Sequence, residues 1–198
     1  TARYHTTLGV WPYSYGNTLQ RGLGAHEVLD VIEDVCALYP VDQARIYLVG
    51  YSAGGGGCWR IAVRYPDRFA AMAPHVGYDL WGYLNVQNLG IWQRVGALTP
   101  YAGIASAIEK LRLLGADARL SVDDNRIKPL HYGEVWDSLE PWLLSKRSER
   151  WPRRVVYTTY GDIDGAYWVH GILPTRFGHA ATVAATVVTN GEIVVQTE

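Results

Sequence analysis

The sequence predicts an α/β protein whose parallel β-sheet is flanked by helices, followed by a β-rich C-terminal segment. Over most of the chain, short apolar runs typical of buried strands alternate with amphipathic helical patterns. Strands that alternate with helices pair in parallel through right-handed crossovers. After Pro152 the pattern changes to short runs rich in Val and Thr, separated by turn signals. We therefore expect an α/β domain over residues 1–150 and a β-rich appendage over residues 151–198.

The elements of the α/β domain follow from apolar spacing and from Gly and Pro at their ends. Apolar runs of strand length predict buried strands, and apolar residues every three or four positions predict helices. Pro40 and Gly115 end two of the helices. Gln93 and Arg94 make the third parallel strand a poor match to a buried one. The expected elements are strands at 6–10, 45–49, 69–76, 90–95 and 118–122, helices at 25–39, 60–65, 101–114 and 135–146 (bent near Pro141), and a loop or short helix at 78–88.

The C-terminal segment is expected to form a small set of strands joined by tight turns. Asp164-Gly165 and Asn190-Gly191 are strong turn dipeptides, and the second lies between two runs rich in Val and Thr. Four strands are too few to close a sandwich alone, so they must pack on the α/β domain or on another chain. The predicted strands span residues 154–160, 165–171, 181–189 and 192–197.

The composition is that of an ordinary globular protein and argues against several classes of function. Hydrophobic residues make up 48% of the 198 residues and the net charge is −1. A nearly neutral chain gives no electrostatic case for binding nucleic acid, and no apolar run is long enough to span a bilayer. No histidine or cysteine spacing indicates a metal site, so neither a metal nor a cofactor is expected. Cys36 and Cys58 fall on separate helices, which predicts two free, mostly buried thiols. The chain begins at Thr1 without a signal-peptide pattern, which fits a processed chain and leaves its compartment open.

A G-x-S-x-G motif directly follows the strand predicted at residues 45–49. It reads Gly50-Tyr51-Ser52-Ala53-Gly54 and leads into a helical pattern. In this context the motif places a serine on a strained turn, whose neighbours must be small to avoid the adjacent strand and helix. The N-terminus of the following helix can stabilise an oxyanion. We predict Ser52 as a nucleophile, the Ala53 N–H as an oxyanion donor, and Tyr51 as a substrate-binding residue.

A serine nucleophile on such a turn needs a histidine base that follows the last strand of the parallel sheet. Of the six histidines, only His131 has this placement, in the loop after the strand at 118–122 and before a helix. We therefore predict His131 as the general base. His75 ends the strand after the nucleophile and is expected to line the site. Trp11, in the N-terminal loop, is a further candidate for substrate binding.

The region around Ser52 resembles a known family. The stretch DQARIYLVGYSAGGGGCWRIAVRYPDRFAAMAPHVG is similar to the nucleophile region of α/β-hydrolases of the esterase, polyhydroxyalkanoate-depolymerase and prolyl-oligopeptidase-like group. The similarity runs from about residue 16 to residue 131. The positions that carry it are Asp42, Arg45, Tyr47, Gly50, Ser52, Gly54, Tyr65, Pro66, Phe69, Ala70 and Ala71.

The resemblance implies a partial α/β-hydrolase sheet, because relatives have two or three more strands and an oxyanion loop before the region that matches. The loop at 11–16 would then have to supply the second oxyanion donor. The open edge of the first parallel strand would need a cover. That cover could be the strand at 6–10, the C-terminal strands, or a second copy of the chain in a homo-oligomer.

The sequence offers several candidates for the acid of the predicted catalytic triad. Relatives carry H-G-x-x-D-x-x-V-P after the third strand, whereas here Val95 and Thr99 take the places of His and Asp. Threonine cannot stabilise an imidazolium as a carboxylate does. The alternatives are Asp79, which follows the strand after the nucleophile, and Asp123 or Asp124, which precede His131. A chain with no working acid is the remaining alternative.

Three functions remain under consideration from the sequence. The resemblance implies hydrolysis of small or polymeric carboxylic esters through an acyl-Ser52 intermediate, with His131 as the base. A serine peptidase would use the same machinery. The third function is that of an impaired or non-catalytic relative, which acts as a binding or structural module. It is favoured by the loss of the usual acid at Thr99 and by the short N-terminal part.

Overall fold

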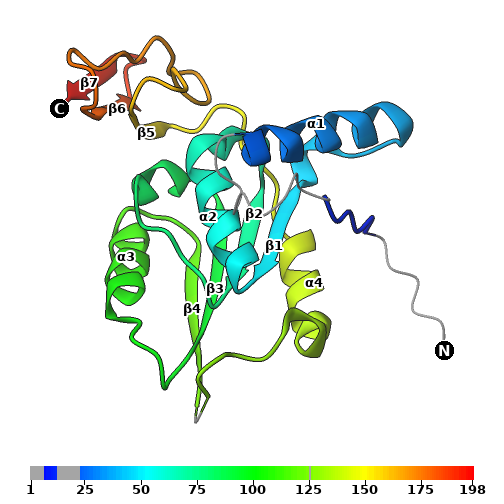
Figure 1. The fold of residues 1–198 in the computed structure, drawn as a ribbon. Coiled ribbons are helices and arrows are strands. Elements are labelled where there is room, and N and C mark those ends of the chain that lie inside the picture. Colours follow the sequence, from blue (N-terminus) through cyan, green and yellow to red (C-terminus); the bar gives the residue numbers. More distant parts are fainter. Residues whose placement is uncertain (1–6, 13–22, 125) are drawn as a thin grey trace.

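The computed structural model describes residues 7–12, 23–124 and 126–198, which contain two β-sheets (Figure 1). Four parallel strands have the order β1-β2-β3-β4, and three antiparallel strands have the order β5-β6-β7. The strands are β1 (Tyr47–Tyr51), β2 (Ala71–His75), β3 (Gly90–Gly96), β4 (Ala118–Asp123), β5 (Arg154–Thr159), β6 (Ala181–Val187) and β7 (Ile193–Thr197). The helices are α1 (Leu23–Leu38), α2 (Ala53–Arg64), α3 (Ala102–Leu113) and α4 (Trp136–Leu144), and the 3-10 turns are η1 (Gln43–Arg45), η2 (Pro66–Arg68), η3 (Tyr83–Val86) and η4 (Tyr132–Glu134).

The parallel sheet is the middle of three layers, which confirms the predicted α/β fold. Successive side chains of a strand point to opposite faces, so each strand contributes to two cores. On one face, Met72 of β2 and Ile91 of β3 pack with residues of α1, α2 and α3. On the other face, Ala71 and Ala73 pack with α4, and Trp92 packs against the same cluster. The fully buried strand β2 therefore anchors the sheet at its centre.

The free edge of β1 faces an apolar groove. Within the described residues, β1 pairs with β2 alone. A groove of about 660 Å³ lies beside β1 and is lined by residues of the segment 7–12, α1, β1 and α2. The segment 7–12 is fixed to α4 by a hydrogen bond of 2.7 Å from Thr7 Oγ1 to Glu140 Oε1.

The strand predicted at residues 6–10 is wrong for residues 7–10, which contain no strand, and Thr6 lies outside the described residues. The C-terminal strands do not pair with β1 either, since they form a sheet of their own. A homo-oligomer that covers this edge stays a prediction.

The antiparallel sheet contacts the end of α2 that is remote from Ser52. The Tyr157 hydroxyl donates to the carbonyl of Arg64, the last residue of α2, at 2.7 Å. The buried Asn85 amide donates to Val63 O at 2.7 Å and to Thr158 O at 3.0 Å, and so links α2 to β5. Figure 1 shows this sheet at one end of the molecule and the carboxyl ends of the parallel strands at the other. The C-terminal strands therefore support the α/β unit from the end opposite the G-x-S-x-G turn. A domain boundary at residue 150 stays a prediction.

The predicted strand at residues 165–171 is wrong. Only one isolated bridge forms there, between Ala166 and Val169. Tyr167 has φ of 58° and Gly171 has φ of 78°, so the backbone turns instead of extending. The turn is held in place because the Tyr167 hydroxyl donates to Pro66 O at 3.2 Å. By contrast, the turn predicted at Asn190-Gly191 joins β6 to β7 as expected.

Both cysteines are free, as predicted, but only Cys58 is fully buried, and Cys36 is half-buried. None of the described helices combines the length and the apolar character needed to cross a membrane.

Candidate active site

Ser52 occupies a strained turn between β1 and α2. Its backbone has φ of 57° and ψ of −115°, a region that side-chain-bearing residues rarely adopt. The Ser52 N–H donates to the carbonyl of His75 at 2.9 Å, which ties the turn to the end of β2. Such strain costs about 1–3 kcal/mol and persists only where the surrounding structure enforces it. This geometry is the one that exposes a nucleophilic hydroxyl at the carboxyl end of a sheet.

Glycines surround this turn because the backbone segments approach one another too closely for any side chain. A Cβ atom on Gly50 would lie 2.2 Å from Gly54 O, and one on Gly77 would lie 2.2 Å from Ser52 O. A Cβ on Gly55 would lie 2.5 Å from His75 O. Gly50, Gly55 and Gly77 are therefore required by packing at the turn itself.

The N-terminus of α2 is available to stabilise negative charge beside Ser52. Ala53 is the first residue of this 12-residue helix, so its N–H has no acceptor within the helix. The helix dipole also places partial positive charge at this end. Ala53 is exposed, which suits the predicted oxyanion donor.

His131 lies in the loop after β4, and its ring packs on the residue that precedes the serine. The ring centroids of His131 and Tyr51 are 4.7 Å apart, with an interplanar angle of 49°. His131 Nδ1 accepts a hydrogen bond of 3.3 Å from the Gly133 N–H. A neutral imidazole whose Nδ1 is an acceptor carries its proton on Nε2, whereas the catalytic triad uses the opposite tautomer. The pairing of His131 with Ser52 stays a prediction.

The three predicted acids differ in their surroundings. Asp79 lies 3.6 Å from Arg60 of α2 and accepts a hydrogen bond of 3.2 Å from the Trp81 N–H. Asp123 forms an ion pair of 2.6 Å with Arg94, and both side chains are nearly buried. Asp124 is exposed at the end of β4. The choice among the three carboxylates stays a prediction.

Thr99 lies in the turn after β3, where relatives would carry the aspartate. Its hydroxyl donates to Gly96 O at 2.9 Å, and the Thr99 N–H is directed to the same carbonyl at 3.2 Å. The side chain therefore stabilises its own turn.

Glu134 is a carboxylate that the sequence analysis missed. Its Oε2 accepts a hydrogen bond of 2.8 Å from the His131 N–H, and its own N–H donates to His131 O at 2.9 Å. This reciprocal pattern resembles a capping box, in which residues three apart satisfy each other's backbone groups. The available signal was a glutamate three residues after His131, at the end of the short helical turn η4. Glu134 therefore holds the backbone of the predicted base.

His75 is fully buried at the end of β2, next to the loop that carries His131. Its Nδ1 lies 3.3 Å from the carbonyl oxygen of Leu130, so Nδ1–H is the donor. Burial, together with the positive charge of Arg94, lowers the pKa of His75 to about 4. His75 is therefore neutral near pH 7.

The buried His75 predicts a loss of stability in acid. The pKa of His75 is about 4 in the folded chain and 6.5 in the reference state, so the unfolded chain binds more protons between these values. The contribution of neutral His75 to the free energy of unfolding is complete above pH 6.5 and declines as the pH falls. At pH 5 about 2 kcal/mol of this stability is lost. Urea unfolding at pH 7 and pH 5 should show this loss in the wild type. The other groups near His75 are Arg94, Asp123, His131 and Tyr51. All four are also present in the control variant of the next paragraph, so they contribute to the pH dependence of both proteins.

The matched control for this experiment is His75→Asn, which keeps a hydrogen-bond donor near the Nδ1 position but does not titrate. Between pH 7 and pH 5, we expect the free energy of unfolding of this variant to fall by about 2 kcal/mol less than that of the wild type. Equal pH dependence in the two proteins would contradict the assignment to His75.

Trp11 lies in the segment 7–12 with its side chain 77% exposed. Its ring lies over Gly9, where a Cβ atom would meet it at 2.8 Å. Its role in substrate binding stays a prediction.

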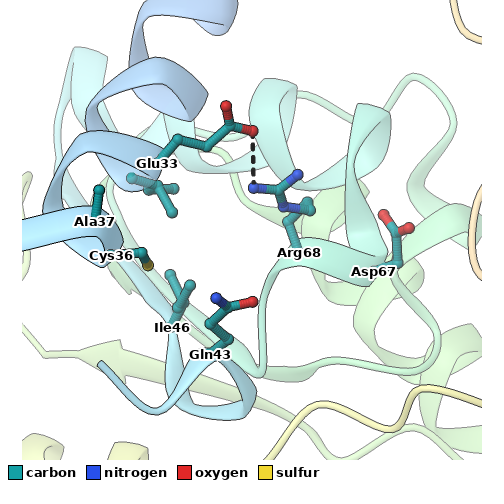
Figure 2. A pocket seen from close by; sticks show the side chains of 8 residues that line it. Glu33, Cys36, Ala37, Gln43, Ile46, Asp67 and Arg68 are labelled. Atoms are coloured by element: carbon teal, nitrogen blue, oxygen red, sulfur yellow. Dashed lines mark hydrogen bonds and ion pairs between the residues drawn. The ribbon is translucent and has the colours of Figure 1, made fainter. Parts of the chain in front are cut away.

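A pocket of about 600 Å³ lies at the opposite end of the sheet from Ser52 (Figure 2). It lies between α1, η1 and η2, near the amino ends of β1 and β2. Glu33 and Arg68 form an ion pair of 3.4 Å at its side, and the half-buried Cys36 contributes to its wall. In the part of the chain that the structure describes, no group of three or more His, Cys, Asp or Glu residues is arranged to hold a metal ion.

A parallel sheet with a strained serine turn between a strand and a helix defines the α/β-hydrolase class. Residues 3–120 match the family described as Esterase PHB depolymerase. The chain belongs to this family.

Three of the solved structures that the chain matches are esterases by name. A thermostable esterase is 20% identical with a TM-score of 0.52, and the match covers 68% of this chain and 39% of that one. Esterase PE8 is 22% identical with a TM-score of 0.47, covering 62% of this chain and 61% of that one. The Bacillus cereus carboxylesterase is 22% identical with a TM-score of 0.42, covering 61% and 59%. The chain thus spans less than two thirds of the length of each of these structures. No curated protein sequence matches it.

Proposed function

We propose that this chain hydrolyses carboxylic esters through an acyl-Ser52 intermediate, with His131 as the general base. The observation that carries the proposal is the strained backbone of Ser52, with φ of 57°, between β1 and α2. Strain of this kind is retained where a reactive side chain must be presented. Membership of an esterase family supports an ester as the substrate.

The proposed reaction has two halves. In acylation, the imidazole of His131 accepts the Ser52 hydroxyl proton while Oγ bonds to the ester carbonyl carbon. The Ala53 N–H stabilises the oxyanion, and the C–O bond to the alcohol breaks as His131 returns the proton to the leaving oxygen. In deacylation, His131 takes a proton from water, which attacks the acyl carbon. The bond between the acyl carbon and Ser52 Oγ then breaks as His131 gives its proton to Oγ, which releases the carboxylic acid and restores the Ser52 hydroxyl.

This mechanism requires a change at the His131 ring. Because Nδ1 accepts from the Gly133 N–H, the neutral ring carries its proton on Nε2 and this nitrogen cannot accept another. A rotation that releases Gly133, or transfer of the proton to Nδ1, generates the basic nitrogen. The energy needed for this change lowers the fraction of chains ready to react.

The second candidate function is a binding or structural module that has lost catalytic activity. It is favoured by Thr99, whose hydroxyl is directed to Gly96 O where relatives place a carboxylate. Loss of the acid alone slows a serine hydrolase by roughly four orders of magnitude.

Turnover of p-nitrophenyl acetate, compared with a Ser52→Ala control, tests the proposal. We expect the wild type to release p-nitrophenol and to react with a fluorophosphonate probe at Ser52, and the control to do neither. The matched p-nitroanilide measures peptidase activity on the same chain. Turnover and labelling that persist in the control would contradict the role of Ser52. Absence of both in the wild type would support the binding module.

A further inference from the structure

The backbone of Leu130, the residue before His131, is held on both sides by side chains of the parallel sheet. Its N–H donates to Asp123 Oδ2 at 2.5 Å. Its carbonyl accepts from His75 Nδ1 at 3.3 Å. One contact comes from the end of β4 and the other from the end of β2. We call these two hydrogen bonds the Leu130 clamp.

Residues from the other two strands reinforce the Leu130 clamp. Arg94 of β3 holds Asp123 in an ion pair of 2.6 Å, with exposed side-chain fractions of 11% and 12%. The Tyr51 hydroxyl at the end of β1 donates to the carbonyl of Pro129 at 3.2 Å. All four parallel strands therefore contribute one side chain to fix the same short stretch of loop.

The two oxygens of Asp123 are engaged with different partners. Oδ1 faces Arg94 and Oδ2 accepts the N–H of Leu130. A nearly buried carboxylate with a cation on one oxygen and an amide on the other is strongly held in place. Asp123 therefore holds the backbone of Leu130, the residue that precedes His131.

We propose that His75 and Asp123 are positioning residues that fix the Leu130 backbone and thereby hold His131 beside the serine turn. This inference rests on the proposed function, in which His131 is the base. Without the clamp, the loop after β4 gains conformational freedom, and the imidazole spends less time in a reactive geometry. Misplacement of a catalytic group by about 1 Å can lower the rate by roughly a hundredfold.

A matched pair of variants tests the role of His75. His75→Leu removes the donor to Leu130 O, whereas His75→Asn keeps an N–H near the position of Nδ1. We expect kcat for p-nitrophenyl acetate to fall by about 30- to 100-fold in His75→Leu with KM within about twofold of the wild type. His75→Asn should recover kcat to within about fivefold. A rise in KM without a fall in kcat would place His75 in substrate binding and overturn the proposal.

Amide hydrogen exchange at Leu130 gives a readout that does not depend on activity. Loss of one clamp hydrogen bond should speed this exchange by about tenfold in His75→Leu and in Asp123→Ala, which has no side-chain acceptor for the Leu130 N–H. If His75→Leu fails to fold, Tyr51→Phe removes only the hydroxyl that holds Pro129. It should then lower kcat severalfold and speed exchange at Leu130.

The outcomes separate the positioning role from the proposed function. Faster exchange at Leu130 together with an unchanged kcat would overturn the positioning role alone. Unchanged exchange in both clamp variants would overturn the clamp. Absence of Ser52-dependent turnover in the wild type would overturn the proposed function and the positioning role with it.

Discussion

Replacing Ser52 by glycine is expected to abolish ester turnover and at the same time to make the folded chain more stable. The hydroxyl is the nucleophile of the proposed reaction, and loss of a catalytic serine lowers kcat by about 10⁶ in a comparable hydrolase. The backbone of Ser52, at φ 57° and ψ −115°, lies in a region that glycine adopts readily. Relief of about 1–3 kcal/mol of strain outweighs the about 0.5–1 kcal/mol of extra chain entropy that glycine brings to the unfolded state. A net gain of about 1 kcal/mol follows.

Ser52→Ala is the matched control because it removes the hydroxyl and keeps the strained side-chain-bearing backbone. Both variants should lose turnover, but only Ser52→Gly should gain stability, so the two should differ by about 1 kcal/mol in urea unfolding. Equal stabilities would contradict the strain at Ser52. Residual turnover in either variant would contradict its role as the nucleophile.

The positions of the parallel strands along the chain could be predicted because local signals agreed with the tertiary structure. Each strand from β1 to β4 lies within one or two residues of its predicted limits. The runs that form β1 and β2 are mainly apolar, and β2 is buried along its whole length. The G-x-S-x-G motif placed the turn correctly, because close packing at Gly50 leaves few other sequences able to form it.

The residues that weakened the prediction of β3 have partners on helix α2 and on the neighbouring strand β4. Gln93 is fully buried and accepts a hydrogen bond of 2.8 Å from Trp59 Nε1. Arg94 is paired with Asp123 at the carboxyl end of the sheet. A buried polar side chain is tolerated where its hydrogen bonds are satisfied, and these partners are distant in sequence. Periodicity alone therefore could not reveal them.

The surroundings of His131 were also beyond local sequence signals. Its placement in the chain indicated a role as the base, but the contacts of Leu130 come from β2 and β4. The strand predicted at 165–171 failed for a related reason. Its conformation depends on Tyr167, whose hydroxyl is bound by Pro66 about a hundred residues earlier in the chain. Long-range contacts of this kind override local strand preference.

The two motif glycines that flank Ser52 should respond in opposite ways to replacement by alanine. A Cβ on Gly50 would lie 2.2 Å from Gly54 O and 2.8 Å from Cys58 Sγ, whereas one on Gly54 meets nothing within 4 Å. Gly50→Ala must therefore displace the first turn of α2, at a cost of about 3 kcal/mol or more. Gly54→Ala lies inside the helix, where the change from glycine stabilises by up to about 1 kcal/mol.

Urea unfolding of the two variants measures this difference, and p-nitrophenyl acetate turnover shows its effect on the site. Because the first turn of α2 carries the Ala53 N–H and directly follows Ser52, its displacement in Gly50→Ala should lower kcat by about a hundredfold. Gly54→Ala has space for its methyl group, so its free energy of unfolding should equal or exceed that of the wild type. Comparable stability in the two variants would mean that the backbone of β1 and α2 can separate at this turn. In that case the close packing of Gly50 would not be what holds Ser52 in its strained conformation.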